Sequence, residues 1–406
     1  MRTIVKNRPK ENEAWQNGFY LLDKPIPKIK KSEVLIKVFA AAICGTDVGI
    51  YNSKDSLRVT MLKAKTNPIT IGHEFSGTFA EATPQARKIL SKIIFNRAKK
   101  IPQIKKLIRG MSLEKISQEK YFSKIIKHFH FTAEMHITCG KCYQCKQNDK
   151  HVCQNTIIKG LHDDGAFAEY VSVPAENILL YHKSEIPLEI MAFMDALGNA
   201  THTIFSADVK GKDIAVLGCG VQGLMAIAIA KTAGAKNIFV TDASRENFSH
   251  KKLIEKRFAL AKKFGATLCF DMAVENERNN FSNEIFKITK NNGIEAAFEM
   301  SGSYSAYRDV FKVLRMGGTF SLLGLPSGNM EVDFAKEVIF KGITIKGIIG
   351  RRVFETWNQM EILLKKGLTK KLISNGFVIH QLPLEKFDDA FELLKNGEAF
   401  KILLKP

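Results

Sequence analysis

The stretch Asp213-Ile214-Ala215-Val216-Leu217-Gly218-Cys219-Gly220-Val221-Gln222-Gly223 decides the predicted fold. Its first five residues read as a buried strand, and its glycines follow the pattern G-x-G-x-x-G before an apolar helical segment, Leu224–Thr232. In this context the glycines let backbone amides approach a pyrophosphate, whose charge the helix N-terminus attracts. The stretch therefore predicts a dinucleotide site at Gly218, Gly220 and Gly223. The alternative is a glycine-rich turn without a ligand.

An acidic residue follows at the distance expected for such a site. The next predicted strand ends at Asp242, 19 residues after Gly223. A carboxylate there accepts hydrogen bonds from the adenosine ribose and repels a 2′-phosphate, which selects NAD over NADP. Strand candidates alternate with helix-length segments and predict a doubly wound parallel sheet of Rossmann type, in the α/β class: Asp213–Leu217, Asn237–Thr241, Ala266–Phe270, Ala296–Met300, Gly318–Leu323 and Ile343–Ile348.

Length and composition set the frame around this sheet. The chain has 406 residues, 45% of them hydrophobic and 25% charged, which fits two or three core-forming domains. This excludes wholesale disorder, a fibrous repeat and a disulfide-stapled miniprotein. Strand-like segments are also expected at Val34–Ala40, Gly165–Pro174 and Phe400–Leu404, with helix after Glu355.

Targeting and membrane segments are not expected. Met1–Lys10 is basic, but no apolar region of a secretory signal follows it. The longest apolar run, Ile214–Ala230, approaches membrane-spanning length, but the glycines of the dinucleotide motif interrupt it. Four of the seven cysteines lie within residues 139–153, which favours a metal in a reducing, cytoplasmic compartment over disulfides.

These four cysteines form a C-x2-C-x2-C-x7-C array of Cys139, Cys142, Cys145 and Cys153. Such spacing suits four thiolates on a tetrahedral structural zinc with no open position for chemistry. The segment between them is polar and has almost no apolar core, so a metal would have to stabilise it. The alternatives are an iron–sulfur cluster and unpaired thiols.

A looser signal comes from Cys44 with Gly72-His73-Glu74. A thiolate, an imidazole and a carboxylate can hold a catalytic zinc and leave one position for a substrate oxygen. A lone buried cysteine is more often a small core residue, and a lone histidine is more often a polar group with ordinary partners.

Taken together, the motifs resemble the zinc-dependent medium-chain alcohol dehydrogenases, and nearly the whole chain takes part except two insertions. The matching segments end in a run typical of a subgroup that oxidises L-threonine: Ala42–Val48, Gly72–Glu74, His136–Gly140, Leu197–Ala200, Glu299–Gly302, Val338–Gly342, Ile345–Ile348, Gly350-Arg351 and Phe354–Trp357. The resemblance implies a chaperonin-10-like β-rich catalytic domain (residues 1–189 and 351–406, with a zinc lobe at 136–156) and a Rossmann domain (190–350).

The resemblance also implies an activity and an assembly. The reaction would be oxidation of the 3-hydroxyl of L-threonine by NAD to 2-amino-3-oxobutanoate, in a homotetramer with two zinc ions per subunit. A polyol or butanediol dehydrogenase of the same family is the alternative enzyme. A third alternative is a catalytically impaired relative that binds only NAD or polyanions.

Site roles follow from the same resemblance. Cys44, His73 and Glu74 would hold catalytic zinc, which binds the substrate hydroxyl and lowers its pKa. Thr46 would begin the proton relay, Asp195 would support it, and His136 would approach the substrate pocket. Arg351 could face a substrate carboxylate or be a surface charge. The family's cofactor positions correspond to Gln222, Asp242, Leu323, Gly324, Leu325, Ile348 and Ile349, with Arg257 a better candidate than Arg245 for the arginine after the ribose acid.

Two features depart from the family pattern. Gly49 replaces the relay histidine, which predicts a slow enzyme or an altered pH profile. Residues 84–130, the basic insert, replace a short strand–turn–strand and hold thirteen Lys or Arg and two Glu, or +11 of the net +20. The insert is interpreted as a solvated amphipathic insertion, as a disordered or miscoded segment that damages the domain, or as an adaptor for nucleic acid or anionic membrane. The adaptor is the least favoured of the three because no stacking array of aromatic residues accompanies it.

Overall fold

The computed structural model describes residues 1–245 and 248–406, without the side chains of residues 248, 249 and 379. Its contacts divide the chain into two compact units. The first comprises residues 1–195, 378–392 and 401–406, and the second comprises residues 196–377 and 393–400. The domain limits implied by the resemblance, which assign 351–406 to the catalytic domain, stay a prediction.

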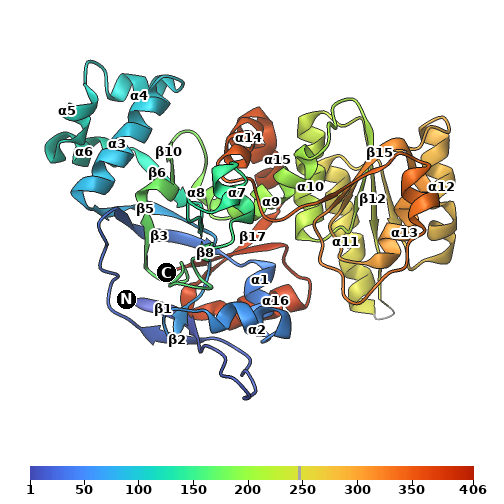
Figure 1. Ribbon diagram of the computed structural model, residues 1–406, viewed down its shortest axis with the longest axis horizontal. Helices are drawn as coiled ribbons and strands as arrows, with labels where there is room; N and C mark the ends of the chain where they lie inside the picture. Colours follow the sequence, from blue (N-terminus) through green and yellow to red (C-terminus); the bar gives the residue numbers. More distant parts are fainter. Residues whose placement is uncertain (246–247) are drawn as a thin grey trace. The chain divides into compact units, whose positions relative to one another are not determined.

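The second unit is built on a six-stranded parallel sheet in the order β13-β12-β11-β14-β15-β16 (Figure 1). Placing β11 in the middle, with later strands on both sides, is the doubly wound Rossmann arrangement. The strands are β11 (Asp213–Leu217), β12 (Asn237–Asp242), β13 (Leu268–Asp271), β14 (Ile294–Glu299), β15 (Leu314–Leu322) and β16 (Thr344–Gly347).

Helices connect these strands, and large buried side chains fill the space between them and the sheet. Phe239, Phe281 and Phe320 lie in one such cluster, almost wholly excluded from solvent. Buried aromatic rings of this size account for much of the free energy of folding. The connecting helices are α10 (Val221–Ala233), α11 (Phe248–Phe264), α12 (Glu275–Ile288) and α13 (Tyr304–Val313), and α14 (Glu355–Leu363) and α15 (Thr369–Ser374) follow β16.

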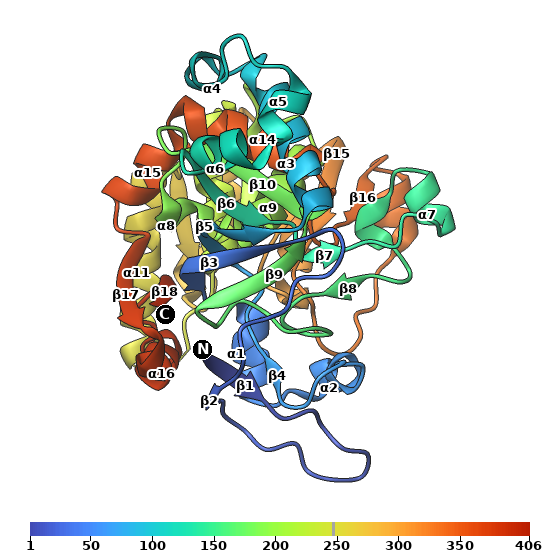
Figure 2. The same ribbon diagram turned by 90° about the vertical axis from the view of Figure 1, so that its left-hand side faces the viewer.

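The first unit is rich in antiparallel strands (Figure 2). Its largest sheet runs β10-β6-β5-β3-β18-β17, with β9 also paired to β3, and a smaller sheet runs β2-β1-β4. The strands are β1 (Arg2–Lys6), β2 (Tyr20–Asp23), β3 (Glu33–Ala42), β4 (Ile69–Thr70), β5 (Phe75–Ala82), β6 (Phe129–Ala133), β9 (Tyr170–Pro174), β10 (Ile178–His182), β17 (Val378–Pro383) and β18 (Lys401–Lys405).

Short elements at the ends of these strands carry the candidate site. Helix α1 (Gly45–Tyr51) follows β3, and α2 (Asp55–Leu62) follows α1. A small hairpin of β7 (His136–Ile137) and β8 (Ile157–Ile158) encloses the cysteine array, which carries α7 (Tyr143–Lys146). Helix α8 (Leu188–Met191) precedes α9 (Met194–Phe205), and α16 (Phe387–Lys395) precedes β18.

The basic insert is helical and ordered, so the interpretation of it as a disordered segment is wrong. It forms α3 (Pro84–Ala98), α4 (Pro102–Leu107), α5 (Leu113–Ser117) and α6 (Glu119–Ile126) between β5 and β6. Thr83 caps α3 by accepting a hydrogen bond from the amide of Ala86, and Pro84 occupies the first turn, where its missing N–H costs nothing.

Most of the predicted strands are confirmed within a few residues, and there are three differences. Only Tyr170–Pro174 of the predicted segment Gly165–Pro174 is a strand, because the backbone of Gly165–Phe167 instead bonds to Thr70, Ile71 and Gly72. Strand β13 begins at Leu268 rather than Ala266. Strand β17 lies in the region predicted to be helical after Glu355. Among the described residues, no helix is both long and apolar enough to cross a membrane.

Candidate active site and metal centres

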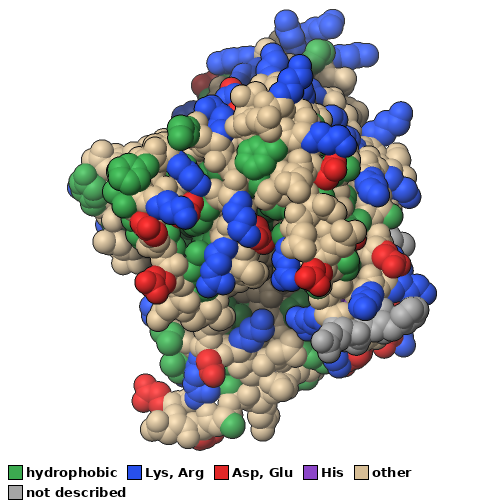
Figure 3. All heavy atoms as spheres, turned by 90° about the vertical axis from the view of Figure 1, so that its right-hand side faces the viewer, with side chains coloured by type: hydrophobic (Ala, Val, Ile, Leu, Met, Phe, Trp, Pro, Cys, Tyr) green, Lys and Arg blue, Asp and Glu red, His purple; other side chains and the backbone are tan. Residues whose placement is uncertain are grey.

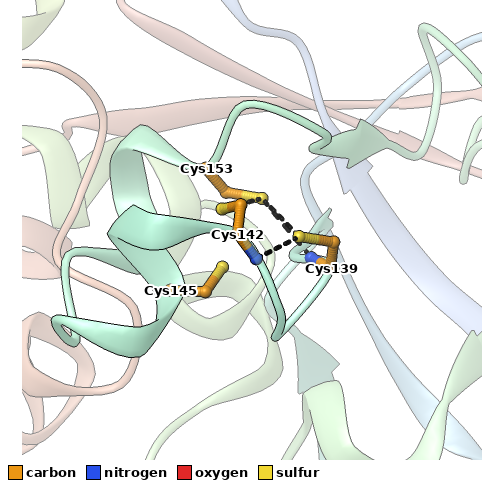
Figure 4. Close-up of side chains that lie close together, drawn as sticks. All are labelled: Cys139, Cys142, Cys145 and Cys153. Carbon is orange, nitrogen blue, oxygen red and sulfur yellow. Dashed lines mark hydrogen bonds between the residues drawn. The ribbon is translucent and has the colours of Figure 1, made fainter.

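The four cysteines of the array converge on one point (Figure 4). The Sγ atoms of Cys139 and Cys153 lie 3.6 Å apart, and those of Cys142 and Cys153 lie 3.8 Å apart. Zinc–sulfur bonds of about 2.3 Å in tetrahedral geometry place neighbouring sulfurs about 3.8 Å apart. All four thiols are free, so the residues fit a tetrahedral zinc and not a pair of disulfides.

The electrostatics of the array also suit a cation. Backbone amides of Lys141 and Cys142 donate to the sulfur of Cys139 and lower its pKa to about 6, so that this thiol is already a thiolate at neutral pH. Burial and the neighbouring thiols instead raise the pKa of Cys145 to about 12. Four sulfurs this close repel one another as thiolates, and a bound cation is what would relieve that repulsion.

A second cluster joins Cys44 to the adjacent residues His73 and Glu74, which lie about thirty positions later in the sequence. One ligand atom from each lies within 4.8 Å of the others. Cys44 is the N-cap of α1, whereas His73 and Glu74 directly precede β5, which pairs with β3. Sheet pairing therefore brings the end of β3 next to the start of β5. The thiolate, imidazole and carboxylate required for a catalytic metal meet at a partly buried point.

Asp47 supports two members of this cluster. Its Oδ2 accepts a hydrogen bond of 2.9 Å from the amide of Cys44, and its Oδ1 lies 3.5 Å from Nδ1 of His73. The side chain of Asp47 is fully buried. A carboxylate behind a metal-binding imidazole fixes the ring and its tautomer, so Asp47 is suited to orient His73 toward an ion.

Lys401 supplies the counter-charge for Glu74. Its Nζ lies 2.6 Å from Oε2 of Glu74 and donates a hydrogen bond of 2.8 Å to the carbonyl of Ile43. Burial, opposed by Lys401, raises the pKa of Glu74 overall. Burial lowers the pKa of Lys401, but the negative charges of Glu74 and Cys44 outweigh it and the net shift is upward. Each member therefore partly offsets the cost of burying the other.

A third group consists of Glu134, His136 and Asp195, whose ligand atoms also lie within 4.8 Å of one another. Oε1 of Glu134 accepts from the amide of His136 and lies 3.0 Å from its Nδ1. Asp195 is buried, and its charge adds to the upward shift in the pKa of Glu74, so it lies near the second cluster. The structure thus brings the predicted residues Asp195 and His136 together.

The predicted proton relay has Thr46 in place but has Gly49 at the position where the family pattern has a histidine. Thr46 lies in the first turn of α1 and is half-buried. A Cβ added at Gly49 would lie only 2.7 Å from Cδ1 of Leu57 and 3.6 Å from Cδ of Lys54. The side chain of Leu57 therefore occupies the space next to Gly49, where a relay histidine would need to pass.

In the second unit, each glycine of the nucleotide motif lies in a different structural setting. Gly218 has φ of +94°, which is strained for any residue with a side chain. A Cβ at Gly223 would lie 1.9 Å from the carbonyl oxygen of Gly218, so only glycine lets the helix approach the turn. Gly220 is the N-cap of α10 and faces open space. The turn leaves room for a pyrophosphate at the start of α10.

The predicted ribose acid lies beside this turn. Oδ2 of Asp242 accepts a hydrogen bond of 3.0 Å from the amide of Cys219 and lies 3.2 Å from a guanidinium nitrogen of Arg257. The other candidate arginine, Arg245, is exposed, and its amide bonds to His250. Among the described residues, Arg257 is therefore the arginine that contacts the predicted ribose acid.

The remaining predicted cofactor positions lie where β15 and β16 end. The amides of Leu323 and Gly324 bond to the carbonyl of Glu299, and the amide of Ile348 bonds to that of Leu322. Leu325 and Ile349 are 92% and 60% exposed, which leaves apolar surface at the carboxyl end of the sheet, where ligands of such folds bind. Oε1 of Gln222 is buried and has no hydrogen-bond partner among the described residues.

Arg351 is 2% exposed, so its interpretation as a surface charge is wrong. Its guanidinium lies 5.6 Å from the ring centroid of Trp357. A Cβ added at Gly198 would lie 2.7 Å from Cδ of Arg351, which explains why the sequence keeps a glycine there.

Three residues of the site were missed by reasoning from the sequence: Asp47, Glu134 and Lys401. Asp47 and Glu134 lie three residues after Cys44 and two residues before His136, a spacing at which a carboxylate can reach back to a ligand. That spacing was the available signal for both. No local signal marks Lys401, which precedes the apolar run Ile402-Leu403-Leu404 of β18.

Comparison with protein families agrees with this geometry. Residues 222–366 match the model described as zinc-binding dehydrogenase, and residues 30–92 and 129–183 match the alcohol dehydrogenase GroES-like domain. The second match leaves out residues 93–128, which form most of the basic insert.

Relatives and solved structures extend over the whole chain. An L-threonine 3-dehydrogenase of Caldanaerobacter subterraneus subsp. tengcongensis is 36% identical over 406 residues, covering 100% of this chain and 99% of the relative. The structure of 2R,3R-butanediol dehydrogenase from Bacillus subtilis is similar in fold, with a TM-score of 0.74, 22% identity and full coverage of both chains. An alcohol dehydrogenase structure from Escherichia coli CFT073 in complex with NADH gives a TM-score of 0.75 at 20% identity, covering 100% of this chain and 99% of that one. The chain therefore belongs to the zinc-binding alcohol dehydrogenase family.

Proposed function

We propose that the protein oxidises the 3-hydroxyl of L-threonine with NAD to give 2-amino-3-oxobutanoate and NADH. The observation that carries the proposal is the convergence of Cys44, His73 and Glu74 in a chain that is 36% identical, from end to end, to a relative named L-threonine 3-dehydrogenase. The substrate would be a small amino acid, and each subunit would hold two zinc ions. One would be bound by these three residues and one by the four cysteines.

In this proposal the residues of the first unit hold and orient the reacting groups. A zinc ion bound here supplies Lewis acidity, which lowers the pKa of an alcohol hydroxyl. Cys44 and His73 would be ligands, with Asp47 fixing the imidazole. Glu74 can act as a ligand or stay paired with Lys401, because the ion pair holds its carboxylate next to the site.

Proton removal depends on few groups. Thr46 would accept the substrate proton through its hydroxyl and pass it on, and Asp195 and the Glu134–His136 pair provide acceptors nearby. Gly49 contributes no titratable group, so water must complete the path to solvent. General acid–base catalysis contributes typically about 10²–10⁴-fold, which is the range over which this enzyme would be slower than one with a relay histidine.

The second unit would bind the cofactor, which supplies the hydride acceptor. The turn at Gly218, Gly220 and Gly223 would bind the pyrophosphate, with the backbone amide of Gln222 as a further donor. Asp242 would accept hydrogen bonds from the adenosine ribose, with Arg257 beside it. The exposed apolar side chains of Leu325 and Ile349, with the backbone of Leu323, Gly324 and Ile348, would line the nicotinamide end.

The proposal includes assembly and location. Strand β16 is an edge strand whose residues are all exposed, and Phe340 nearby is 79% exposed. An exposed edge strand is suited to pair with a second copy, so we include a homo-oligomer, with a tetramer as the expected state. Seven free thiols support a reducing, cytoplasmic compartment.

The test is NADH formation by purified, zinc-replete protein with a panel of alcohols. The expected result is turnover of L-threonine in preference to 2,3-butanediol and polyols, with NAD preferred over NADP. Preference for 2,3-butanediol would replace the threonine assignment with the other dehydrogenase activity. A protein with two zinc ions per subunit that binds NADH but oxidises none of the alcohols would be the impaired relative.

A further inference from the structure

The basic insert (residues 84–130) is the largest feature that the proposed dehydrogenase does not use. It connects the antiparallel strands β5 and β6, and most of it lies outside the family match. It has a core of its own, because Leu90, Ile94, Ile104 and Ile116 are fully buried. It is therefore a folded part of the first unit, and the dehydrogenase reaction does not explain its charged surface.

Two contacts fix the insert to the first unit. Arg97 forms a 2.7 Å ion pair with Glu185, and its guanidinium lies 4.7 Å from the ring centroid of Tyr181 on β10. On the other side, the rings of Phe122 and Phe79 meet edge to face, with centroids 5.5 Å apart. These contacts hold the helices in a defined position, so that their charges form a fixed pattern.

The surface of the insert is strongly and almost uniformly positive. Of its two acidic residues, Glu119 is paired with Arg87 at 3.0 Å, which leaves only Glu114 to offset the other cations. On the face drawn in Figure 3, which looks onto the second unit, Lys and Arg side chains instead lie among scattered Asp and Glu. The exposed cations of the insert are Lys88, Lys92, Lys99, Lys100, Lys105, Lys106, Arg109, Lys115, Lys120, Lys124 and Lys127.

Four of these cations line a cleft of about 840 Å³ between the end of α3 and the segment after α4. They are Lys99, Lys105, Lys106 and Arg109, and no acidic residue lines the cleft. Its apolar lining includes Phe95, whose ring centroid lies 5.8 Å from Nζ of Lys99. The cleft thus combines a ring suited to stacking with cations suited to phosphates.

The shape and charge of this region select among polyanions. A flat bilayer surface cannot enter a cleft. Membrane binding also gains from exposed apolar side chains, yet none of the large exposed apolar side chains among the described residues lies within the insert. A small anion could occupy the cleft but would leave the seven cations outside it without a ligand. A flexible chain of phosphates can bind both to the four cations of the cleft and to the seven cations outside it.

We propose that the basic insert binds single-stranded nucleic acid, with backbone phosphates on the four cations of the cleft and a base stacked on Phe95. The interaction is independent of the dehydrogenase reaction. Release of the counterions that surround the nucleic acid would drive binding. Recognition would depend on the charge of the nucleic acid and on base stacking rather than on its base sequence.

The test is fluorescence anisotropy of labelled oligouridylate and oligothymidylate titrated with the full-length, zinc-replete protein. For the four phosphate contacts in the cleft alone, a fourfold rise in salt should weaken binding to a single strand roughly 50-fold, and contacts to the cations outside the cleft should add to this. The quadruple variant K99Q/K105Q/K106Q/R109Q should bind more weakly and should lose the part of the salt dependence that the cleft contributes. The variant Phe95→Leu should weaken binding about tenfold without changing the salt dependence, because it removes only stacking.

The matched control is K251Q/K252Q/K262Q/K263Q, which removes four exposed charges from α11 in the second unit. It should bind as the wild type does, and far-UV circular dichroism and zinc content should be unchanged in all variants. The proposal is overturned if neither oligonucleotide binds at low salt, or if both quadruple variants lose binding equally. It is also overturned if pyrophosphate competes as well as the oligonucleotide, or if phosphatidylserine vesicles bind and oligonucleotides do not.

Discussion

The two metal clusters of the first unit are built in opposite ways. The cysteine lobe takes all four ligands from residues 139–153, and its surroundings are polar and largely exposed. The cluster of Cys44, His73 and Glu74 takes its ligands from two segments, with buried partners on both sides: Asp47 behind the imidazole and Lys401 behind the carboxylate.

The comparison separates what a metal does for folding from what it does for chemistry. In the lobe, sulfur spacing follows from sequence spacing, and nothing but an ion would stabilise the arrangement. In the second cluster, a paired sheet and hydrogen bonds hold the ligands before any ion arrives. Loss of metal should therefore unfold the lobe but leave the second cluster folded and inactive.

The largest effect is expected for Cys145→Ser. Structural zinc contributes on the order of 10 kcal/mol in small peptides, and removal of one of four ligands should leave the lobe unfolded. Zinc content should fall by one ion per subunit, and limited proteolysis should cut within residues 136–156. Cys269→Ser, which changes a free thiol outside both clusters, is the control and should resist protease as the wild type does. If the lobe of the Cys145→Ser variant resisted protease after losing its zinc, the lobe would not depend on metal for its folding.

In contrast to Cys145→Ser, the variant Cys44→Ser should lose activity and keep its fold. Loss of this thiolate should lower kcat/KM by at least roughly 10⁴-fold, or about 5.4 kcal/mol of transition-state stabilisation, with little change in the melting temperature. Activity and differential scanning calorimetry would be measured on the same sample. A large fall in the melting temperature would mean that this cluster, like the lobe, depends on its metal for folding.

Lys401→Met tests the buried partner. It leaves Glu74 charged and buried without its cation, which should destabilise the fold by roughly 3–5 kcal/mol. Lys401→Arg retains the charge and should restore part of the loss. Urea denaturation of the two variants gives the comparison. If the methionine variant were as stable as the wild type, the ion pair would not be what holds Glu74 in place.

The smallest effect is expected at Gly49. Gly49→His alone meets the side chain of Leu57, so the double variant Gly49→His/Leu57→Ala is the fair test. If the missing histidine limits turnover, kcat should rise by about tenfold or more in the double variant, with a changed pH profile. Leu57→Ala alone is the control. An unchanged kcat in the double variant would show that water already carries the proton.

The sequence allowed the local parts of this molecule to be predicted. The run Asp213–Gly223 contains its own strand, turn and helix signals, and the cysteine array encodes its geometry in its spacing. Convergence of Cys44 with His73 rested on the family resemblance, because only the pairing of β3 with β5 brings them together.

The parts that could not be predicted depend on contacts between distant segments. Leu57 fills the space at Gly49 only because α2 folds back on α1. The helices of the basic insert are short and broken by Pro102 and Gly110, so their shared core was not visible in any one segment. Strand β17 follows a helical stretch and was missed although Asn375-Gly376, a turn signal, lies just before it.

Lys401 makes the order of synthesis matter. It is separated by 358 residues from Ile43, whose carbonyl it contacts, and β18 completes the sheet beside β3. A chain leaving the ribosome therefore carries Glu74 without this cation, and Ala41 and Ala42 of β3 without their partners on β18, until residues 401–405 have been made. The centre can acquire its final charge balance only after translation has passed Lys401, which delays maturation of this cluster relative to that of the lobe.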